Sequence, residues 1–236
     1  MFSRAAMCLA AILASLAVTA SALATPHTVI VLRHGEKQNP YALCQTGMDR
    51  ANALAVQYLG KGAANSLFAG SDGPAAFLAI TLHTLELITP AAASWGLPVT
   101  MFSVMPDKKA RFDGALDLRT QQAARAVMTD PQWSGKTVVM AWEHRHIADK
   151  KLEAKSPGER STLRQLLNLD KLAGVPETWP GGNYDYFWIV QYGAPGSDVP
   201  TEFKSVKQVF APPFEKLPSN DWGSVERLPL SARCLR

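Results

Sequence analysis

The stretch VIVLRHGEK, residues 29–37, decides the fold. Its first four residues are all apolar, and an unbroken apolar run of this length predicts a strand that is covered on both faces. The run stops abruptly at the segment RHGEK, residues 33–37. The sequence therefore predicts a buried strand that delivers a reactive histidine at its carboxyl end. The alternative is a strand that ends in ordinary solvated charge.

Strands and helices are expected to alternate along the rest of the chain. Apolar runs rich in β-branched residues predict strands, and apolar residues at helical spacing predict helices. The predicted strands are Val29–Leu32, Ser66–Ala69, Leu97–Phe102, Lys136–Trp142 and Tyr184–Tyr192, and the predicted helices are Gly47–Leu59, Thr81–Trp95, Leu116–Met128 and Glu159–Leu169. This alternation is typical of an α/β fold, a three-layer sandwich with a mostly parallel central sheet and helices on both faces.

The first 24 residues have the layout of a secretory signal peptide. Arg4 precedes a long apolar stretch, and residues 22–24 (ALA) give the small-x-small cleavage pattern. An uncleaved N-terminal anchor is the alternative. No later stretch reaches the roughly 18 apolar residues of a membrane span. We therefore expect a periplasmic or secreted protein with one domain at residues 25–236 and no membrane contact after cleavage.

Two cysteines remain after cleavage, Cys44 and Cys234. In an oxidising compartment such a pair forms a disulfide more often than not, and two buried free thiols are the alternative. A disulfide would tie the C-terminal tail to the loop that follows the RHG segment. The tail itself, residues 193–236, has several prolines and little periodicity. We predict that it covers the domain without forming a second one.

Two of the predicted strands end in histidine-bearing segments. Leu32 runs into Arg33 and His34, and Trp142 runs into the segment EHRH, residues 143–146. In open α/β sheets, ligands bind beyond the carboxyl ends of the strands. Both segments are therefore expected at the same edge of the sheet, where they would form a shared site.

The residues of these two segments suit a phosphoryl group. Arginines such as Arg33 and Arg145 match phosphate oxygens through a planar fork of donors. A neutral imidazole, His34, can attack phosphorus, and a second, protonated imidazole, His144, can stabilise the charge on the phosphoryl oxygens. Gly35 lets the backbone pass close to the ligand.

The same residues carry a family resemblance. LRHGEK, followed by LCQTGMDRANALA, resembles the opening of the histidine phosphatase superfamily, which is also called phosphoglycerate mutase-like. VVMAWEHRHI resembles the second histidine motif of the branch that reads W-E-H, and WPGGNYDYFWIV is similar to that branch's last strand. The resemblance covers roughly residues 27–192.

The resemblance implies a role for most of these side chains. His34 would be the phosphorylated nucleophile, Arg33 and His144 would hold the phosphate, and Lys37 would be a weaker phosphate contact. Glu143 is a candidate proton donor, with Asp107 and Asp113 as alternatives. The substrate-binding residues would be Gly35, Lys37, His83 and Arg145.

One departure from the family pattern stands out. HTLELITP, residues 83–90, places His83 where the pattern R-x-x-x-T-x-x-P has a second phosphate-binding arginine. Histidine can donate a hydrogen bond but lacks the bidentate fork of arginine. The expected turnover is correspondingly weak.

The resemblance implies an exported phosphomonoesterase of the histidine acid phosphatase type, with a phosphohistidine intermediate and a small phosphorylated substrate. A non-catalytic periplasmic relative that binds phosphate or another anionic ligand is the alternative. His146 with His144, and with His34 or His83, raises a zinc alternative, but the spacing matches no strong metal signature. We expect neither a metal nor a cofactor. The net charge of +4 is spread along the chain, so no nucleic-acid partner is expected. Substrate identity and oligomeric state stay open.

Overall fold

The computed structural model describes residues 24–68, 70, 72–155, 157–194, 196–224, 228 and 233–235. The predicted signal peptide lies outside the described residues except for Ala24, whose N–H donates to the Met128 carbonyl. In this described part of the chain, no helix is both long and apolar enough to cross a membrane.

A mixed sheet organises the chain. Its strands are β1 (Thr28–Arg33), β2 (Pro74–Ala79), β3 (Val99–Met101), β4 (Thr137–Trp142), β5 (Tyr186–Tyr192) and β6 (Pro200–Lys207), in the order β3-β2-β4-β1-β5-β6. β1 is parallel to β4, and β2 is parallel to both β4 and β3. β5 is antiparallel to β1, and β6 is antiparallel to β5. The prediction of a mostly parallel sheet is therefore wrong.

The reversal of β5 follows from where its leading loop lies. The carbonyls of Pro180, Gly181 and Asn183 accept hydrogen bonds from Arg33, at the carboxyl end of β1. The next strand therefore starts at that edge and runs back against β1. β6 begins at Pro200, only a few residues after β5 ends at Tyr192, and a connection this short suits antiparallel neighbours, because parallel strands need a longer crossover.

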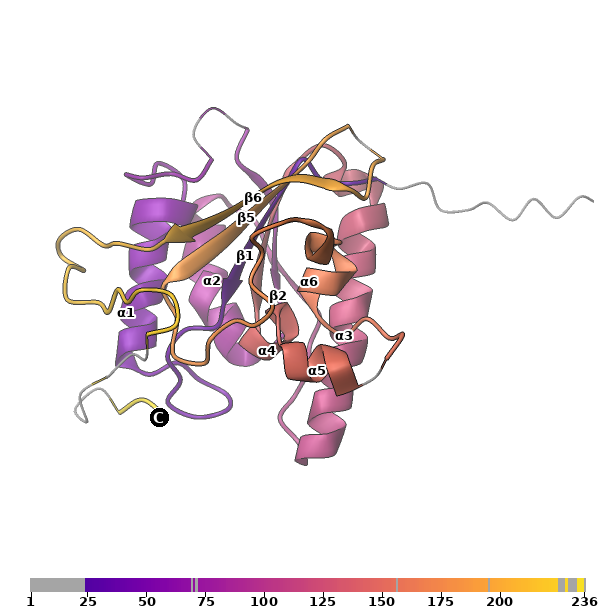
Figure 1. Ribbon diagram of the computed structural model, residues 1–236. Helices are drawn as coiled ribbons and strands as arrows, with labels where there is room; N and C mark the ends of the chain where they lie inside the picture. Colours follow the sequence, from indigo (N-terminus) through magenta and orange to yellow (C-terminus); the bar gives the residue numbers. More distant parts are fainter. Residues whose placement is uncertain are drawn as a thin grey trace, which may run out of the picture.

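The helices pack on the two faces of the sheet (Figure 1). They are α1 (Gln45–Leu54), which continues as the π-helical turn η1 (Ala55–Leu59), α2 (Leu82–Ser94), α3 (Lys109–Thr129), α4 (His144–Ile147), α5 (Lys150–Lys155) and α6 (Leu163–Leu166), with 3-10 turns η2 (Pro131–Trp133) and η3 (Leu169–Lys171). Ile30 and Leu32 pack with residues of α1 and α2, whereas Val29 and Val31 pack with residues of α3. This alternation is the two-residue period of a strand that is buried on both sides.

Two predicted elements are wrong. Residues 66–68 form no strand, since residues 67–68 lie in a turn, and the Phe68 ring packs edge-to-face on Trp95 with centroids 5.6 Å apart. The strand begins instead at Pro74. Proline is tolerated there because the first position of a strand does not need its N–H for the sheet. The predicted helix Glu159–Leu169 contracts to the single turn α6, and Asn168, with a φ of 60°, ends it in the left-handed region.

The C-terminal tail both covers the domain and extends its sheet. The tail contains a strand that the sequence patterns did not indicate, β6, which pairs with β5 along its whole length. Beyond β6, the backbone of Val209 and Ala211 exchanges hydrogen bonds with Tyr58 and Gln57 of η1. Cys44 and Cys234 form the predicted disulfide, so the end of the chain is fastened beside the loop that follows β1.

Candidate active site

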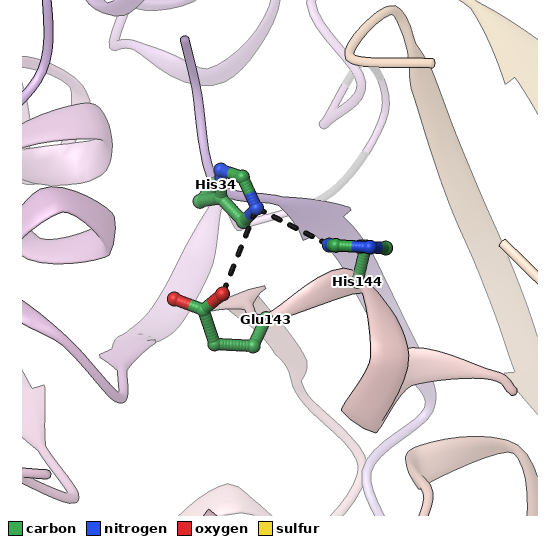
Figure 2. A group of neighbouring side chains, drawn as sticks. All are labelled: His34, Glu143 and His144. Carbon is green, nitrogen blue, oxygen red and sulfur yellow. Dashed lines mark hydrogen bonds and ion pairs between the residues drawn. The ribbon is translucent and has the colours of Figure 1, made fainter. Parts of the chain in front are cut away.

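The histidine-bearing ends of β1 and β4 lie side by side, as the sequence predicts. Parallel pairing of the two strands sets Arg33 opposite Trp142. The His34 N–H then donates to the Trp142 carbonyl at 2.8 Å, one residue beyond the strand. His34, Glu143 and His144 therefore leave the sheet at one edge, with their side chains turned toward one another (Figure 2).

His34 is held as a neutral imidazole with a defined tautomer. Its Nδ1 lies 2.8 Å from the Gly35 carbonyl, which can only accept, so Nδ1 carries the proton. Burial, together with the positive charge of Arg33, lowers the pKa of His34 well below its usual value. The lone pair on Nε2 therefore faces the site, in the form of imidazole that acts as a nucleophile.

Arg33 is buried and fixed from two sides. Its Nη1 donates to the carbonyls of Pro180, Gly181 and Asn183 at 2.8–3.2 Å. Its guanidinium carbon lies 4.0 Å from the centre of the Tyr184 ring. Its Nη2 lies 3.0 Å from Nε2 of His34 and 3.4 Å from Nδ1 of His144. One edge of the guanidinium is thus used for position, and the other faces the two histidines.

His144 begins the short helix α4 and completes this group. Its Nδ1 lies 3.3 Å from Nε2 of His34. Burial, and then the charge of Arg33, lowers the pKa of His144 to about 3. His144 is therefore neutral in this structure, whereas the predicted role on a phosphoryl group uses its protonated form. A bound phosphate dianion would favour the protonated form by its charge.

Glu143 brings a carboxylate into contact with this group. Its Oε2 lies 3.6 Å from Nε2 of His34 and 3.7 Å from Nζ of Lys37. Its Oε1 accepts hydrogen bonds from Thr81 at 3.1 Å and from His83. Burial acts to raise the pKa of Glu143, but the hydrogen bond and charge of His83 and the charge of Lys37 act against it, and the pKa lies well below its usual value.

His83 is hydrogen-bonded to Glu143 in this structure. Its Nε2 is bonded to Glu143, and its Nδ1 lies 3.1 Å from the Pro40 carbonyl. A carbonyl and an ionised carboxylate are both acceptors, so an imidazolium with two N–H donors satisfies both contacts. The ring stands edge-on to His34, with centroids 5.2 Å apart. The position at which the family pattern has an arginine thus holds a carboxylate in place.

Other predicted residues lie at the border of the site or outside it. A Cβ on Gly35 would meet Leu87 and Leu43 at 3.1 and 3.2 Å, so its missing side chain allows close helix packing. Arg145 is half-exposed and pairs with Asp149 at 2.9 Å. His146 bonds Asp117 at 3.0 Å.

A cavity of about 300 Å³ opens beside Glu143. It is lined by Lys37, Pro40, His83, Pro106, Asp107, Phe112, Glu143 and Leu235. Of the two alternative proton donors, Asp107 therefore lies on the cavity wall, where it pairs with Arg111. The larger cavities at α3 and at the amino ends of the strands are lined by none of the candidate site residues.

His34, Glu143 and His144 offer three ligand atoms within 4.8 Å of one another, a spacing that can hold a metal ion. The same two ring nitrogens, however, lie 3.0 and 3.4 Å from Nη2 of Arg33. A cation there would meet the guanidinium charge at close range. The donor set therefore fits an anion better than a metal, and no step of the reaction is assigned to one.

Sequence reasoning missed several residues that build the site. The loop 180–183 and Tyr184 position Arg33, and Thr81 bonds Glu143. Arg50 forms a buried ion pair with Glu36, its Nε lying 3.1 and 3.0 Å from the two carboxylate oxygens. The signals were present, since Arg50 and the loop both stand in the quoted motifs. Their partners, however, lie far away in the sequence.

The comparisons with known proteins give remote structural likeness. No family model and no curated protein matches the sequence. Similar solved structures include a proposed phosphohistidine phosphatase SixA from Agrobacterium tumefaciens (15% identity, TM-score 0.36, covering 76% of this chain and 98% of that chain). Others are a mycobacterial glucosyl-3-phosphoglycerate phosphatase (14%, 0.42, 78% and 99%) and a mycobacterial hydrolase (13%, 0.39, 88% and 94%). At these values the likeness carries no argument of its own, and the resemblance to the histidine phosphatase superfamily is borne by this chain's own residues.

Proposed function

We propose that the chain is an exported phosphomonoesterase of the histidine phosphatase superfamily, of the histidine acid phosphatase type, that acts through a phosphohistidine at His34. The observation that carries the proposal is the state of His34. Its Nδ1 N–H donates to the Gly35 carbonyl, and its lowered pKa leaves Nε2 unprotonated at neutral pH, where Nε2 accepts from Nη2 of Arg33 until a phosphoryl oxygen takes that donor. An imidazole in this form can attack phosphorus and form a covalent intermediate.

The reaction has two steps. In the first, Nε2 of His34 bonds to phosphorus while the bond from phosphorus to the leaving oxygen breaks, and Glu143 gives that oxygen a proton. In the second, water attacks phosphorus, Glu143 takes a proton from the water, the N–P bond breaks, and inorganic phosphate leaves. Arg33, through Nη2, and His144 are placed to hold the phosphoryl oxygens.

The charge of the substrate prepares Glu143 for the first step. The low pKa of Glu143 keeps it ionised in this structure, whereas a proton donor must be protonated. A phosphate dianion placed beside Glu143 would raise that pKa, because like charges repel. Substrate binding at acidic pH would therefore take up a proton, which suits an acid phosphatase.

Export rests on the predicted signal peptide at residues 1–24 and is supported by the disulfide between Cys44 and Cys234. Disulfides persist in oxidising compartments such as the periplasm or the extracellular space and are rare in the cytosol. The proposed localisation is therefore periplasmic or secreted.

A second candidate is a non-catalytic periplasmic relative that binds phosphate or another anionic ligand. One observation favours it. His83, which stands in place of the family's second arginine, is bonded to Glu143 and Pro40. The phosphoryl group would then lack a second bidentate donor, and transition-state stabilisation would fall by about 3 kcal/mol, the scale of one lost oxyanion donor.

Hydrolysis of 4-nitrophenyl phosphate by residues 25–236, measured between about pH 4 and 8, separates the two candidates. The enzyme proposal expects turnover, loss of turnover in His34→Ala, and little change in the control His27→Ala, whose side chain is exposed. It also expects that, when the phosphate of the substrate is labelled, the label stays bound to the wild-type protein after an alkaline quench. If the wild type shows no turnover but phosphate still raises its Tm, the binding candidate stands. The absence of both turnover and a thermal shift would overturn both candidates.

A further inference from the structure

We propose that the cavity beside Glu143 receives the leaving group of the substrate, and that the substrates are phosphomonoesters of aromatic or other apolar alcohols. The proposal rests on the proposed function, since it extends the same site. The wall of the cavity is largely apolar and is formed by Pro40, Pro106, Phe112 and Leu235. With a volume of about 300 Å³, the cavity lies at the lower end of the range for small-molecule pockets.

The position of Glu143 connects the cavity with the reacting atoms. Its carboxylate lines the cavity, and its Oε2 lies 3.6 Å from Nε2 of His34. In an in-line displacement the leaving oxygen lies opposite the attacking nitrogen, on the far side of phosphorus. An oxygen that Glu143 protonates therefore stands at the inner end of the cavity. The carbon attached to that oxygen would extend into it.

The polar groups of the cavity gather at this inner end. Lys37, His83 and Glu143 form one connected group, and His83 is engaged by Pro40 and Glu143. At the outer end Asp107 pairs with Arg111. The hydroxyls of a sugar or glycerol leaving group would lose water against proline, phenylalanine and leucine without regaining partners, which is costly. A phenyl ring loses nothing there and gains apolar contact.

The C-terminal tail supplies one wall of the cavity. The Leu235 N–H donates to the Lys37 carbonyl at 2.6 Å, and the neighbouring Cys234 is bonded to Cys44. The Leu235 side chain is 51% exposed, although it lies on an apolar wall. A bound apolar group would cover it. The disulfide therefore holds a part of the substrate pocket in place, as well as stabilising the fold.

The test compares two non-hydrolysable ligands by calorimetry in phosphate-free buffer: phenylphosphonate and methylphosphonate, with the whole mature chain. The proposal expects phenylphosphonate to bind at least about tenfold more tightly, because only its ring reaches the cavity. Phe112→Ala should bring the ratio of the two affinities close to one. The matched control is Leu118→Ala, which removes an exposed leucine from the same helix outside this cavity and should keep the ratio.

The tail is tested in the same assay. Leu235→Asp, with the disulfide intact, should lower the affinity for phenylphosphonate far more than that for methylphosphonate. Cys234→Ser should do the same by releasing Leu235. Equal affinities in the wild type, or binding of neither ligand, would overturn the proposal. If Phe112→Ala and Leu235→Asp both keep the wild-type ratio, the proposal is also overturned.

Hydrolysis separates this inference from the proposed function. Phenyl phosphate should be cleaved with a kcat/KM at least about tenfold above that of glycerol phosphate. His34-dependent turnover without this preference would leave the phosphatase intact and overturn the leaving-group assignment. A tenfold ligand preference without any turnover would preserve an apolar anion-binding pocket and overturn the phosphatase.

Discussion

Nη2 of Arg33 lies 3.0 Å from Nε2 of His34, so a fixed guanidinium faces the ring nitrogen that we propose as the nucleophile. This contact has two consequences. The charge of Arg33 helps, after burial, to lower the pKa of His34, which keeps the ring neutral. The same N–H lies where an oxygen of a phosphoryl group on Nε2 can accept it.

Replacement of Arg33 by lysine tests this arrangement. Lysine keeps the charge but lacks the planar fork, so it cannot both donate to the loop 180–183 and face His34. We expect kcat/KM for an aryl phosphate to fall by about 10²–10³, the scale of a lost oxyanion donor. Arg119→Lys, on the exposed face of α3, is the control and should change kcat/KM less than twofold. A similarly small effect of Arg33→Lys would contradict the assigned role.

Glu143→Gln tests the proton donor through the leaving group. If Glu143 protonates the leaving oxygen, its loss should slow esters of weakly acidic alcohols by about 10²–10⁴. An ester with a good leaving group, such as 4-nitrophenyl phosphate, needs no such proton and should be slowed much less in the phosphorylation step. The measurement is burst-phase kinetics across a series of phenyl phosphates. An equal loss for all leaving groups would show that Glu143 acts in another way.

His83→Leu tests whether His83 positions and charges Glu143. The hydrogen bond and the charge of His83 help to lower the pKa of Glu143. Without them that pKa rises. Because a proton donor loses activity as the pH rises through its pKa, the alkaline limb of the rate profile should move to higher pH, with a lower maximum. His83→Arg restores a cation and should raise the rate above that of the leucine variant. An unmoved limb in His83→Leu would leave His83 with a purely structural role.

Much of the site was accessible from the sequence because its two halves are local. The segments RHG and EHR each follow an unbroken apolar strand, and parallel pairing of β1 and β4 places both at one edge. Pairing partners distant in the sequence were not accessible. Nothing in the spacing indicates that His83 bonds Glu143, sixty positions further along the chain. That contact depends on how α2 packs on the sheet.

The misplaced second strand and the unforeseen direction of β5 have physical reasons as well. β2 has the sequence PAAFLA, and alanine and proline have low strand propensity. The strand was therefore predicted at the more apolar pair Leu67-Phe68. The apolar sequence of β5 indicates a buried strand, but it does not indicate whether that strand runs parallel or antiparallel to β1. Its antiparallel course is set by hydrogen bonds from Arg33 to the preceding loop.

Acid should destabilise the fold through His144. Its pKa is about 3 in the folded chain and about 6.5 when unfolded, so the unfolded state binds more protons between these values. Stability from this group is complete above pH 6.5 and is lost as the pH falls toward 3, by at most roughly 5 kcal/mol. His144→Asn should therefore show a shallower fall of Tm between pH 6 and 4 than wild type or the exposed control His27→Asn. Parallel curves for all three would contradict the assignment.

Arg50 should contribute strongly to the stability of the fold. Its guanidinium is buried against Glu36, with Asp185 3.3 Å from its Nη2. Arg50→Met leaves both carboxylates buried without this partner, so we expect a loss of about 3–5 kcal/mol in the free energy of unfolding. Lys150→Met, which breaks an exposed pair with Glu177, should change it little, because water screens an exposed ion pair. Because the loss comes from uncompensated charge, Arg50→Met should recover part of its stability as the pH falls from 7 to 5 and the carboxyls protonate. A loss that stays constant across that range would point to lost packing instead.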